Sequence, residues 1–151
     1  MTTVRRVQSD DASALVPLFA TLGYPTTTDR LRKRIARLLA DATYDAWIAV
    51  DTDMNVVGFA AGHLIYPIEN DTPAAQLIAL VSAEHARGQG VGSSLCTAFE
   101  QWATIGGATR AVLSSGQNRP DAHRFYEYRG YIRSGIKFGK QLAEMPQIAE
   151  H

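Results

Sequence analysis

Residues 77–93 read LIALVSAEHARGQGVGS, and this stretch decides the fold. Its first part, Leu77–Ser82, is an apolar run typical of a strand at the centre of a sheet. Its last part, Arg87–Ser93, has glycine at alternate positions and leads into a long helical pattern. Glycines allow tight turns, and a helix N-terminus carries free N–H groups at the positive end of the helix dipole. We therefore expect a strand–loop–helix unit that holds a pyrophosphate, with the charge of Arg87 beside it.

The elements around this unit indicate one α/β domain. Apolar spacing predicts strands at 4–8, 46–50, 56–66, 77–82, 111–113 and 131–138, and helices at 12–22, 90–105 and 120–129. A further helix is expected after Thr28 or Asp29, either of which can cap it, with Leu31, Ile35, Leu38 and Leu39 at helical spacing. The second and third strands read as a hairpin around a polar turn. The order β-α-α-β-β-β-α-β-α-β predicts a mixed sheet. We expect 1–151 to form a single domain, with its core at about 4–140 and a frayed tail at 143–151.

The composition of the chain disfavours two classes of partner, nucleic acids and membranes. The chain has 151 residues, with 15 basic and 15 acidic side chains and a formal net charge of zero. This balance does not favour general binding to nucleic acid or to an anionic membrane. Its apolar runs are shorter than the roughly 20 residues that span a bilayer, and the first ten residues lack the apolar stretch of a signal peptide. We therefore expect a cytoplasmic protein.

Three further groups of residues have an ordinary structural interpretation. The basic cluster Arg30–Arg37 follows a helical pattern, which favours a solvated helix face over a phosphate-binding patch. The single cysteine, Cys96, lies among apolar neighbours, which favours a packed thiol over a nucleophile. His, Cys, Asp and Glu do not cluster at ligand spacing, so we expect no metal site.

Two kinds of phosphate-binding loop fit this sequence poorly. A P-loop requires a lysine before its Ser or Thr, and the loop has none. A dinucleotide fingerprint requires a third glycine where Ser93 stands. Its loop follows the first strand of the fold, and an acidic residue comes about twenty positions later. The loop instead follows the fourth predicted strand, and residues 108–115 contain no Asp or Glu. Both enzyme classes are therefore disfavoured, and a nucleotide-binding oxidoreductase is kept only as a third hypothesis.

A third kind of loop fits well. The run Arg87–Gly92 resembles the [QR]-x-x-G-x-[GA] motif of the GNAT superfamily of acyl-CoA-dependent N-acetyltransferases. Asn118, followed by residues 122–131 (AHRFYEYRGY), resembles the second signature of that superfamily. The resemblance covers about 4–140, with the motifs confined to 77–131. It implies a GNAT-like fold with a mostly antiparallel sheet, a bulged fourth strand, and splayed fourth and fifth strands. It also makes a homodimer a candidate assembly.

The resemblance assigns roles to the residues of the motifs. The pantetheine arm of acetyl-CoA would pair with the fourth strand like an added strand, and the pyrophosphate would lie on the glycine loop. The implied cofactor-binding residues are Leu80, Val81, Ser82, Arg87, Gly88, Gln89, Gly90, Val91, Gly92, Ser93 and Asn118. Tyr126 is the implied catalytic residue, placed near the CoA sulfur. Because a phenol is less acidic than a thiol, Tyr126 would steady the leaving thiolate by a hydrogen bond rather than by full proton transfer.

The acceptor side is less defined. Some family members carry a His or Glu base on the fourth strand, where this chain has Ala74, Gln76 and Ile78. The remaining candidates to receive the proton of the amine are His63, Tyr66, Glu69 and Asp71, with relay through water or binding of the neutral amine as alternatives. An aromatic and acidic pocket for a cationic amine could form from Tyr24, Tyr66, Glu69 and Asp71; ordinary loop positions are the equal alternative.

The sequence thus predicts an acetyl-CoA-dependent N-acetyltransferase. It would move an acetyl group to a primary amine of a small molecule or peptide by direct transfer in a ternary complex. The alternative is a non-catalytic acyl-CoA-binding sensor or regulatory module on the same fold. Tyr126 favours the enzyme, whereas the missing base on the fourth strand favours the sensor.

Overall fold

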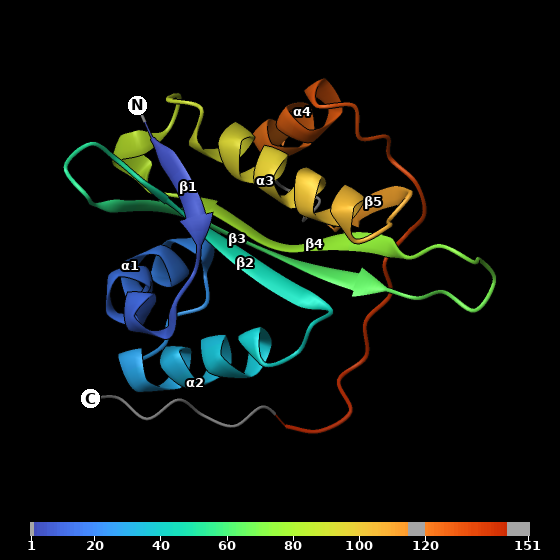
Figure 1. Cartoon of the computed structure of the whole chain (residues 1–151), viewed down its shortest axis with the longest axis horizontal. Helices are drawn as coiled ribbons and strands as arrows, with labels where there is room; N and C mark the ends of the chain where they lie inside the picture. The colour runs from blue at the N-terminus through green and yellow to red at the C-terminus, as the bar shows by residue number, and fades with distance from the viewer. Residues whose placement is uncertain (1, 115–119, 145–151) are drawn as a thin grey trace.

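One five-stranded sheet in the order β1-β2-β3-β4-β5 forms the centre of the computed structural model, which describes residues 2–114 and 120–144 (Figure 1). Its strands are β1 (Thr3–Arg6), β2 (Tyr44–Val50), β3 (Val56–Ile65), β4 (Ala74–Ser82) and β5 (Arg110–Leu113). Neighbouring strands from β1 to β4 are antiparallel, whereas β4 and β5 are parallel. This topology confirms the expected mixed, mostly antiparallel sheet and the β2–β3 hairpin.

Helices cover both faces of the sheet (Figure 1). On one face lie α1 (Ala12–Leu22) and α2 (Thr28–Leu39), and on the other lie α3 (Val91–Ile105) and α4 (Pro120–Tyr128). Short 3-10 turns, η1 (Ser9–Asp11) and η2 (Glu84–Ala86), precede α1 and the glycine loop. Each long helix was predicted from its apolar stripe. None of the described helices combines the length and the hydropathy needed to cross a membrane.

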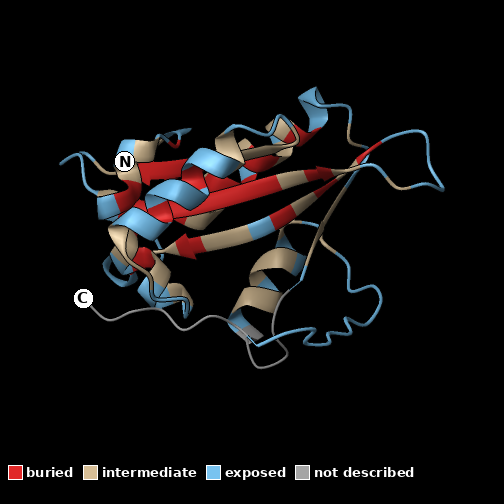
Figure 2. Cartoon of the chain, turned by 90° about the horizontal axis from the view of Figure 1, so that it is seen from below, coloured by how far each residue is buried: buried red, intermediate tan, exposed pale blue. Residues whose placement is uncertain are grey.

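Alternation along β3 separates the two faces. Phe59 packs against Phe19 of α1, with 5.2 Å between ring centroids, whereas Gly58 faces α3. A Cβ at Gly58 would lie 2.5 Å from the Val91 Cγ1 atom, so the absent side chain lets the start of α3 rest directly on the sheet. Figure 2 shows the buried residues concentrated in the central strands between the helix layers. This close packing fixes the glycine loop at the end of β4.

The predicted strand at 131–138 is wrong: residues 131–144 form no strand. The alternation of Ile132, Ile136 and Phe138 suggested a half-buried strand, but these side chains are 87%, 79% and 89% exposed. Gly135 interrupts the segment with a φ of +71°, which is incompatible with extended pairing. The described sheet therefore ends at β5, and the chain continues from α4 along the outside of the molecule (Figure 1).

Candidate active site

β4 and β5 separate at a bulge. Their pairing runs from Ala74 opposite Arg110 to Leu77 opposite Leu113 and ends there. At the next residue the register of β3 against β4 shifts, so that Ile78 is the extra residue of a β-bulge. Beyond the bulge, 78–82 has no partner strand on the β5 side within the described ranges. The structure therefore has the bulged fourth strand that the resemblance implied, and the edge of β4 beyond the bulge is open among the described residues.

The open edge of β4 presents particular backbone groups. The Ala83 N–H donates to the Val57 carbonyl at 2.8 Å, so residue 83 faces β3. Because the backbone groups of an antiparallel strand alternate in direction, those of Leu80 and Ser82 face the opposite, open edge. These are the two residues whose backbone was predicted to pair with pantetheine, and Val81 between them is buried and points its backbone toward β3.

The glycine loop has free donors and free space. Gly88 and Gly90 have φ angles of +81° and +80°, and a Cβ at either position would meet no atom within 4 Å. The N–H groups of Arg87 and Gln89 donate back to the carbonyls of Glu84 and Ala86. In the described part of the chain, by contrast, the backbone N–H groups of Gly88, Gly90, Val91, Gly92 and Ser93 have no protein acceptor.

The geometry of this loop is suited to bind a diphosphate. Gly90 is the N-cap of α3 and supplies no capping side chain, so the first N–H groups of the helix stay available to a ligand. The positive end of the α3 dipole and the exposed Arg87 side chain add positive potential. The row of donors begins where the open edge of β4 ends. The pantetheine and the diphosphate of one CoA molecule could therefore be bound along a continuous surface.

A side-chain network holds the end of α4 against α3. Arg129 donates to Ser93 Oγ at 2.6 Å and to Glu100 Oε1 at 2.8 Å, and the Tyr131 hydroxyl donates to Glu100 Oε2 at 2.8 Å. Burial raises the pKa of Tyr131, and its hydrogen bond to Glu100 raises it further. Ser93, predicted as a cofactor contact, thus has its hydroxyl engaged by Arg129 while its backbone N–H remains free. Sequence reasoning missed Glu100 and Arg129 because their partners are about thirty residues away along the chain.

Tyr126 lies at the junction of α4 with this network. Its ring is half-buried and makes edge contacts with Phe125 and Tyr131, with centroids 5.3 and 5.9 Å apart. A Cβ at Gly92 would lie 3.5 Å from Phe125 and 3.8 Å from the Ser82 Oγ atom. The start of α3, the end of β4 and the α4 residue next to Tyr126 therefore meet at one place. Asn118 lies outside the described residues.

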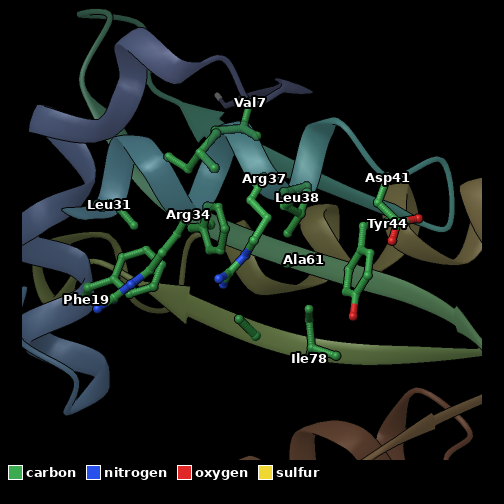
Figure 3. Close-up of a pocket in the computed structure, with 14 residues that line it drawn as sticks. Val7, Phe19, Leu31, Arg34, Arg37, Leu38, Asp41, Tyr44, Ala61 and Ile78 are labelled. Atoms are coloured by element: carbon green, nitrogen blue, oxygen red, sulfur yellow. The ribbon is translucent and has the colours of Figure 1, made fainter. Parts of the chain in front are cut away.

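A cavity of about 430 Å³ lies on the opposite face of the sheet, between α2 and β4. Figure 3 shows its main side chains, which include Phe19, Leu31, Arg34, Arg37, Tyr44 and Ile78. The bulge residue Ile78 lines it, so the cavity reaches the point where β4 and β5 part. Arg34 and Arg37 belong to the basic cluster that was interpreted as a solvated helix face, and both residues are indeed exposed, although they also line the cavity. Their position beside the apolar stripe of Leu31, Ile35 and Leu38 was the available sequence signal.

The residues predicted for an aromatic and acidic acceptor pocket are not brought together. Tyr24 is 69% exposed in the α1–α2 connection, and Tyr66 is 66% exposed at the start of the β3–β4 loop. Glu69 and Asp71 are exposed in that loop, which extends past the end of the sheet farthest from the α1–α2 connection (Figure 1). None of the four is among the residues that line the cavity.

His63 and Cys96 have defined surroundings. The His63 ring stacks on Tyr44 with centroids 3.9 Å apart, and Tyr44 lines the cavity, so His63 lies behind its wall. Cys96 is fully buried in α3, and burial raises the pKa of its thiol to about 11. At neutral pH such a thiol is protonated, which agrees with the predicted packed residue. Among the residues that can be placed, no three His, Cys, Asp or Glu side chains form a group that could hold a metal ion.

Comparisons with known proteins agree with this architecture. The model of the acetyltransferase (GNAT) family matches residues 10–131. An aminoalkylphosphonate N-acetyltransferase of Salmonella typhimurium is 36% identical over 87 residues, which are 58% of this chain and 56% of that protein. The matched region thus spans little more than half the length of this curated relative.

Solved structures show the same fold. A putative acetyltransferase from Agrobacterium tumefaciens superposes with a TM-score of 0.83 at 22% identity, covering 92% of this chain and 99% of the other. A GNAT family acetyltransferase from Staphylococcus aureus gives 0.80 at 23% identity, covering 93% and 98%. The family match places the chain in a class of acyl-transferring enzymes. The chain belongs to the GNAT family of acetyltransferases.

Proposed function

We propose that this protein transfers the acetyl group of acetyl-CoA to a primary amine of a small molecule or peptide. The observation that carries the proposal is the row of free backbone N–H groups from Gly88 to Ser93, which continues the open edge of β4. Donors from a glycine-rich helix start suit a diphosphate, and an unpaired strand edge suits an amide-containing arm. The relative that acts on aminoalkylphosphonates supports a small-molecule amine as the acceptor.

In the proposed direct transfer, different residues of the chain stabilise different groups of the reactants. Acetyl-CoA supplies an activated thioester carbonyl. The amine nitrogen forms a bond to that carbon as the bond from carbon to sulfur breaks. An open-edge N–H of β4, such as that of Leu80, would donate to the carbonyl oxygen as its negative charge develops. Tyr126 would donate a hydrogen bond to the departing thiolate.

The amine must lose a proton during this transfer. An alkylamine with a pKa near 10 is about 0.1% neutral at pH 7. Of the four predicted proton acceptors, we favour His63, because its ring stacks on Tyr44 at the cavity wall. Tyr66, Glu69 and Asp71 lie on the distant β3–β4 loop or at its start. A water molecule in the cavity would connect the amine to the imidazole.

The test is a thiol-release assay with acetyl-CoA and a panel of primary amines, combined with calorimetric titration of acetyl-CoA and of NADH. We expect acetyl-CoA to bind, NADH not to bind, and at least one amine to release CoA. Cys96, which is buried and has a raised pKa, should add little background to the thiol reading. In the same assay His63→Gln should lower the rate of CoA release. Binding of acetyl-CoA without turnover for any amine would indicate the non-catalytic sensor, and binding of NADH alone would refute the proposal.

A further inference from the structure

Two arginines of α2 lie at the cavity and have no protein partner among the described residues. Arg34 and Arg37 are three positions apart, so they project from the same side of the helix. Both side chains line the cavity, and in Figure 3 the Arg37 guanidinium points toward β4 while that of Arg34 points toward Phe19. Neither guanidinium has a hydrogen bond or an ion pair within the part of the chain that the structure describes. By contrast, Arg32 on the same helix pairs with Asp29 at 3.1 Å.

The other described residues of the cavity only partly balance the positive charge of the two arginines. Asp41 is the acidic side chain among the described lining residues. Its Oδ1 atom already accepts hydrogen bonds from the N–H and the hydroxyl of Thr43, at 2.9 and 2.7 Å. These bonds from Thr43 hold the pKa of Asp41 below its usual range, so it carries one negative charge at neutral pH. The described lining thus has two positive charges and one negative charge, and its other side chains are apolar except for Tyr44, so the cavity attracts an anion.

The two ends of the cavity would suit two ends of one small molecule. The β4 end, at Ile78, adjoins the open strand edge where the proposed function puts the reacting amine. Arg34 and Arg37 extend into the cavity from its α2 side, and guanidinium groups bind oxyanions through paired N–H donors. We infer that the acceptor is a small molecule with a primary amine at one end and a phosphonate or phosphate group at the other. Arg34 and Arg37 bind that group and thereby determine specificity. This inference rests on the proposed function, because it names the acceptor class of the same site.

Paired amines test the inference. 2-Aminoethylphosphonate and O-phosphoethanolamine are compared with ethanolamine and propylamine in the thiol-release assay, and taurine and β-alanine serve as singly charged intermediates. We expect the two amines that carry a phosphonate or phosphate group to have the highest kcat/KM. Arg34→Gln and Arg37→Gln should each lower that value about tenfold to a hundredfold, mainly through KM, since each removes a charged hydrogen-bond donor. The ranking of phosphonate and phosphate distinguishes the two sources of the anion.

Lys33→Gln is the matched control. It removes the same charge from the same helix, but Lys33 does not line the cavity. Glutamine is a good helix former, and positions 33, 34 and 37 are exposed, so all three variants should fold; circular dichroism checks this. Lys33→Gln should retain the preference for anionic amines. A wild-type enzyme that uses propylamine as well as 2-aminoethylphosphonate, or a double Arg34→Gln/Arg37→Gln variant that keeps the preference, would overturn the inference and leave the proposed function intact.

A binding measurement covers the case in which no amine turns over. That result would refute the proposed function, and the anion site is then tested with propylphosphonate, which has no amine. Calorimetry is performed with saturating CoA, so that the glycine loop is already occupied. Binding to the wild type and to Lys33→Gln, but at least tenfold weaker binding to the double variant, supports the anion site. Equal binding by all three proteins, or absence of binding by the wild type, overturns it.

Discussion

The glycine loop and the α2 wall of the cavity are both suited to bind anions, but they use different parts of the chain. At the loop, backbone N–H groups of Gly88 and 90–93 are free to donate, and the helix dipole adds to them. At the α2 wall, the donors are the side chains of Arg34 and Arg37. A backbone site depends on the absence of side chains at a few positions. A side-chain site depends on the presence of particular ones.

This difference has a functional consequence. In our proposal the loop holds the part of the reaction that is common to acetyl donors, and the α2 wall holds the part that identifies the acceptor. One exposed substitution on α2 can change the acceptor without altering the fold. A substitution in the loop alters the donor site itself. Mutations on the two sides of the molecule should therefore have different effects and act in different pH ranges. The largest effect is expected at the glycine loop.

Gly90→Glu should have the largest effect. Its side chain would occupy the open space beside the loop, place a carboxylate against the diphosphate, and force glutamate to adopt a φ of +80°. Because juxtaposed like charges cost several kcal/mol, we expect acetyl-CoA affinity to fall by about a thousandfold. Calorimetric titration measures this loss.

Gly107→Glu separates this electrostatic effect from backbone strain. Gly107 has a φ of +88° and equally open surroundings, but it follows the opposite end of α3. The control should retain acetyl-CoA affinity. If both variants lose affinity equally, then strain or misfolding explains the loss, and the loop has no special relation to the diphosphate.

Tyr126→Phe should affect the reaction rather than binding at the donor site. The substitution keeps the aromatic contacts with Phe125 and Tyr131 but removes the hydroxyl. Loss of one donor to a developing anion lowers kcat by about a hundredfold, and acetyl-CoA affinity should change little. Tyr128→Phe is the matched control, because Tyr128 lies on the same helix and is 93% exposed. Equal kcat values for the two variants would remove Tyr126 from the mechanism.

The donor side was far more predictable from sequence than the acceptor side, and the two kinds of site explain why. Glycines at 88, 90 and 92 must appear in the sequence if the backbone is to be approached there, so the loop leaves a readable motif. The core helices were equally readable from their apolar stripes. Arg34 and Arg37 have no such motif, since arginines on a helix are usually solvated. Their relation to Ile78 depends on a bulge and a sheet register that arise only on folding.

The errors have the same origin. The apolar alternation of Ile132, Ile136 and Phe138 satisfied a local rule for a strand, but a strand also needs a partner edge and a backbone free of left-handed residues. Tyr24, Tyr66, Glu69 and Asp71 satisfied a chemical rule for a cationic pocket, but the fold separates the loops that carry them. Glu100 and Arg129 were missed because an ion pair between distant segments has no local pattern.

Tyr131→Phe should lower the stability of the donor side, and this loss should become smaller at alkaline pH. Losing the hydrogen bond to Glu100 should cost about 2 kcal/mol of unfolding free energy at pH 8, since the acceptor is charged. The pKa of Tyr131 is raised in the folded state, so its stabilisation is complete below about pH 10, the pKa of an unfolded tyrosine, and declines as the pH rises further. The difference from wild type in urea unfolding should therefore narrow above pH 10. Tyr128→Phe should show no difference at either pH.

Asp11→Asn should give the smallest effect, a loss of stability at neutral pH that disappears at acidic pH. Burial alone would raise the pKa of Asp11, but hydrogen bonds from Arg5 and from the Gln8 N–H outweigh it and keep this pKa low. The carboxylate therefore stabilises the start of α1 at pH values above about 3.9, the pKa of an unfolded aspartate, and this contribution is lost as the pH falls through the lower folded value. Since Arg5 is half-exposed, we expect a cost of about 1 kcal/mol at pH 7 that disappears near pH 2. Urea unfolding at both pH values measures it, with Asp53→Asn in the exposed β2–β3 turn as the control. A cost that persists at pH 2 would mean that packing, rather than charge, holds this end of α1.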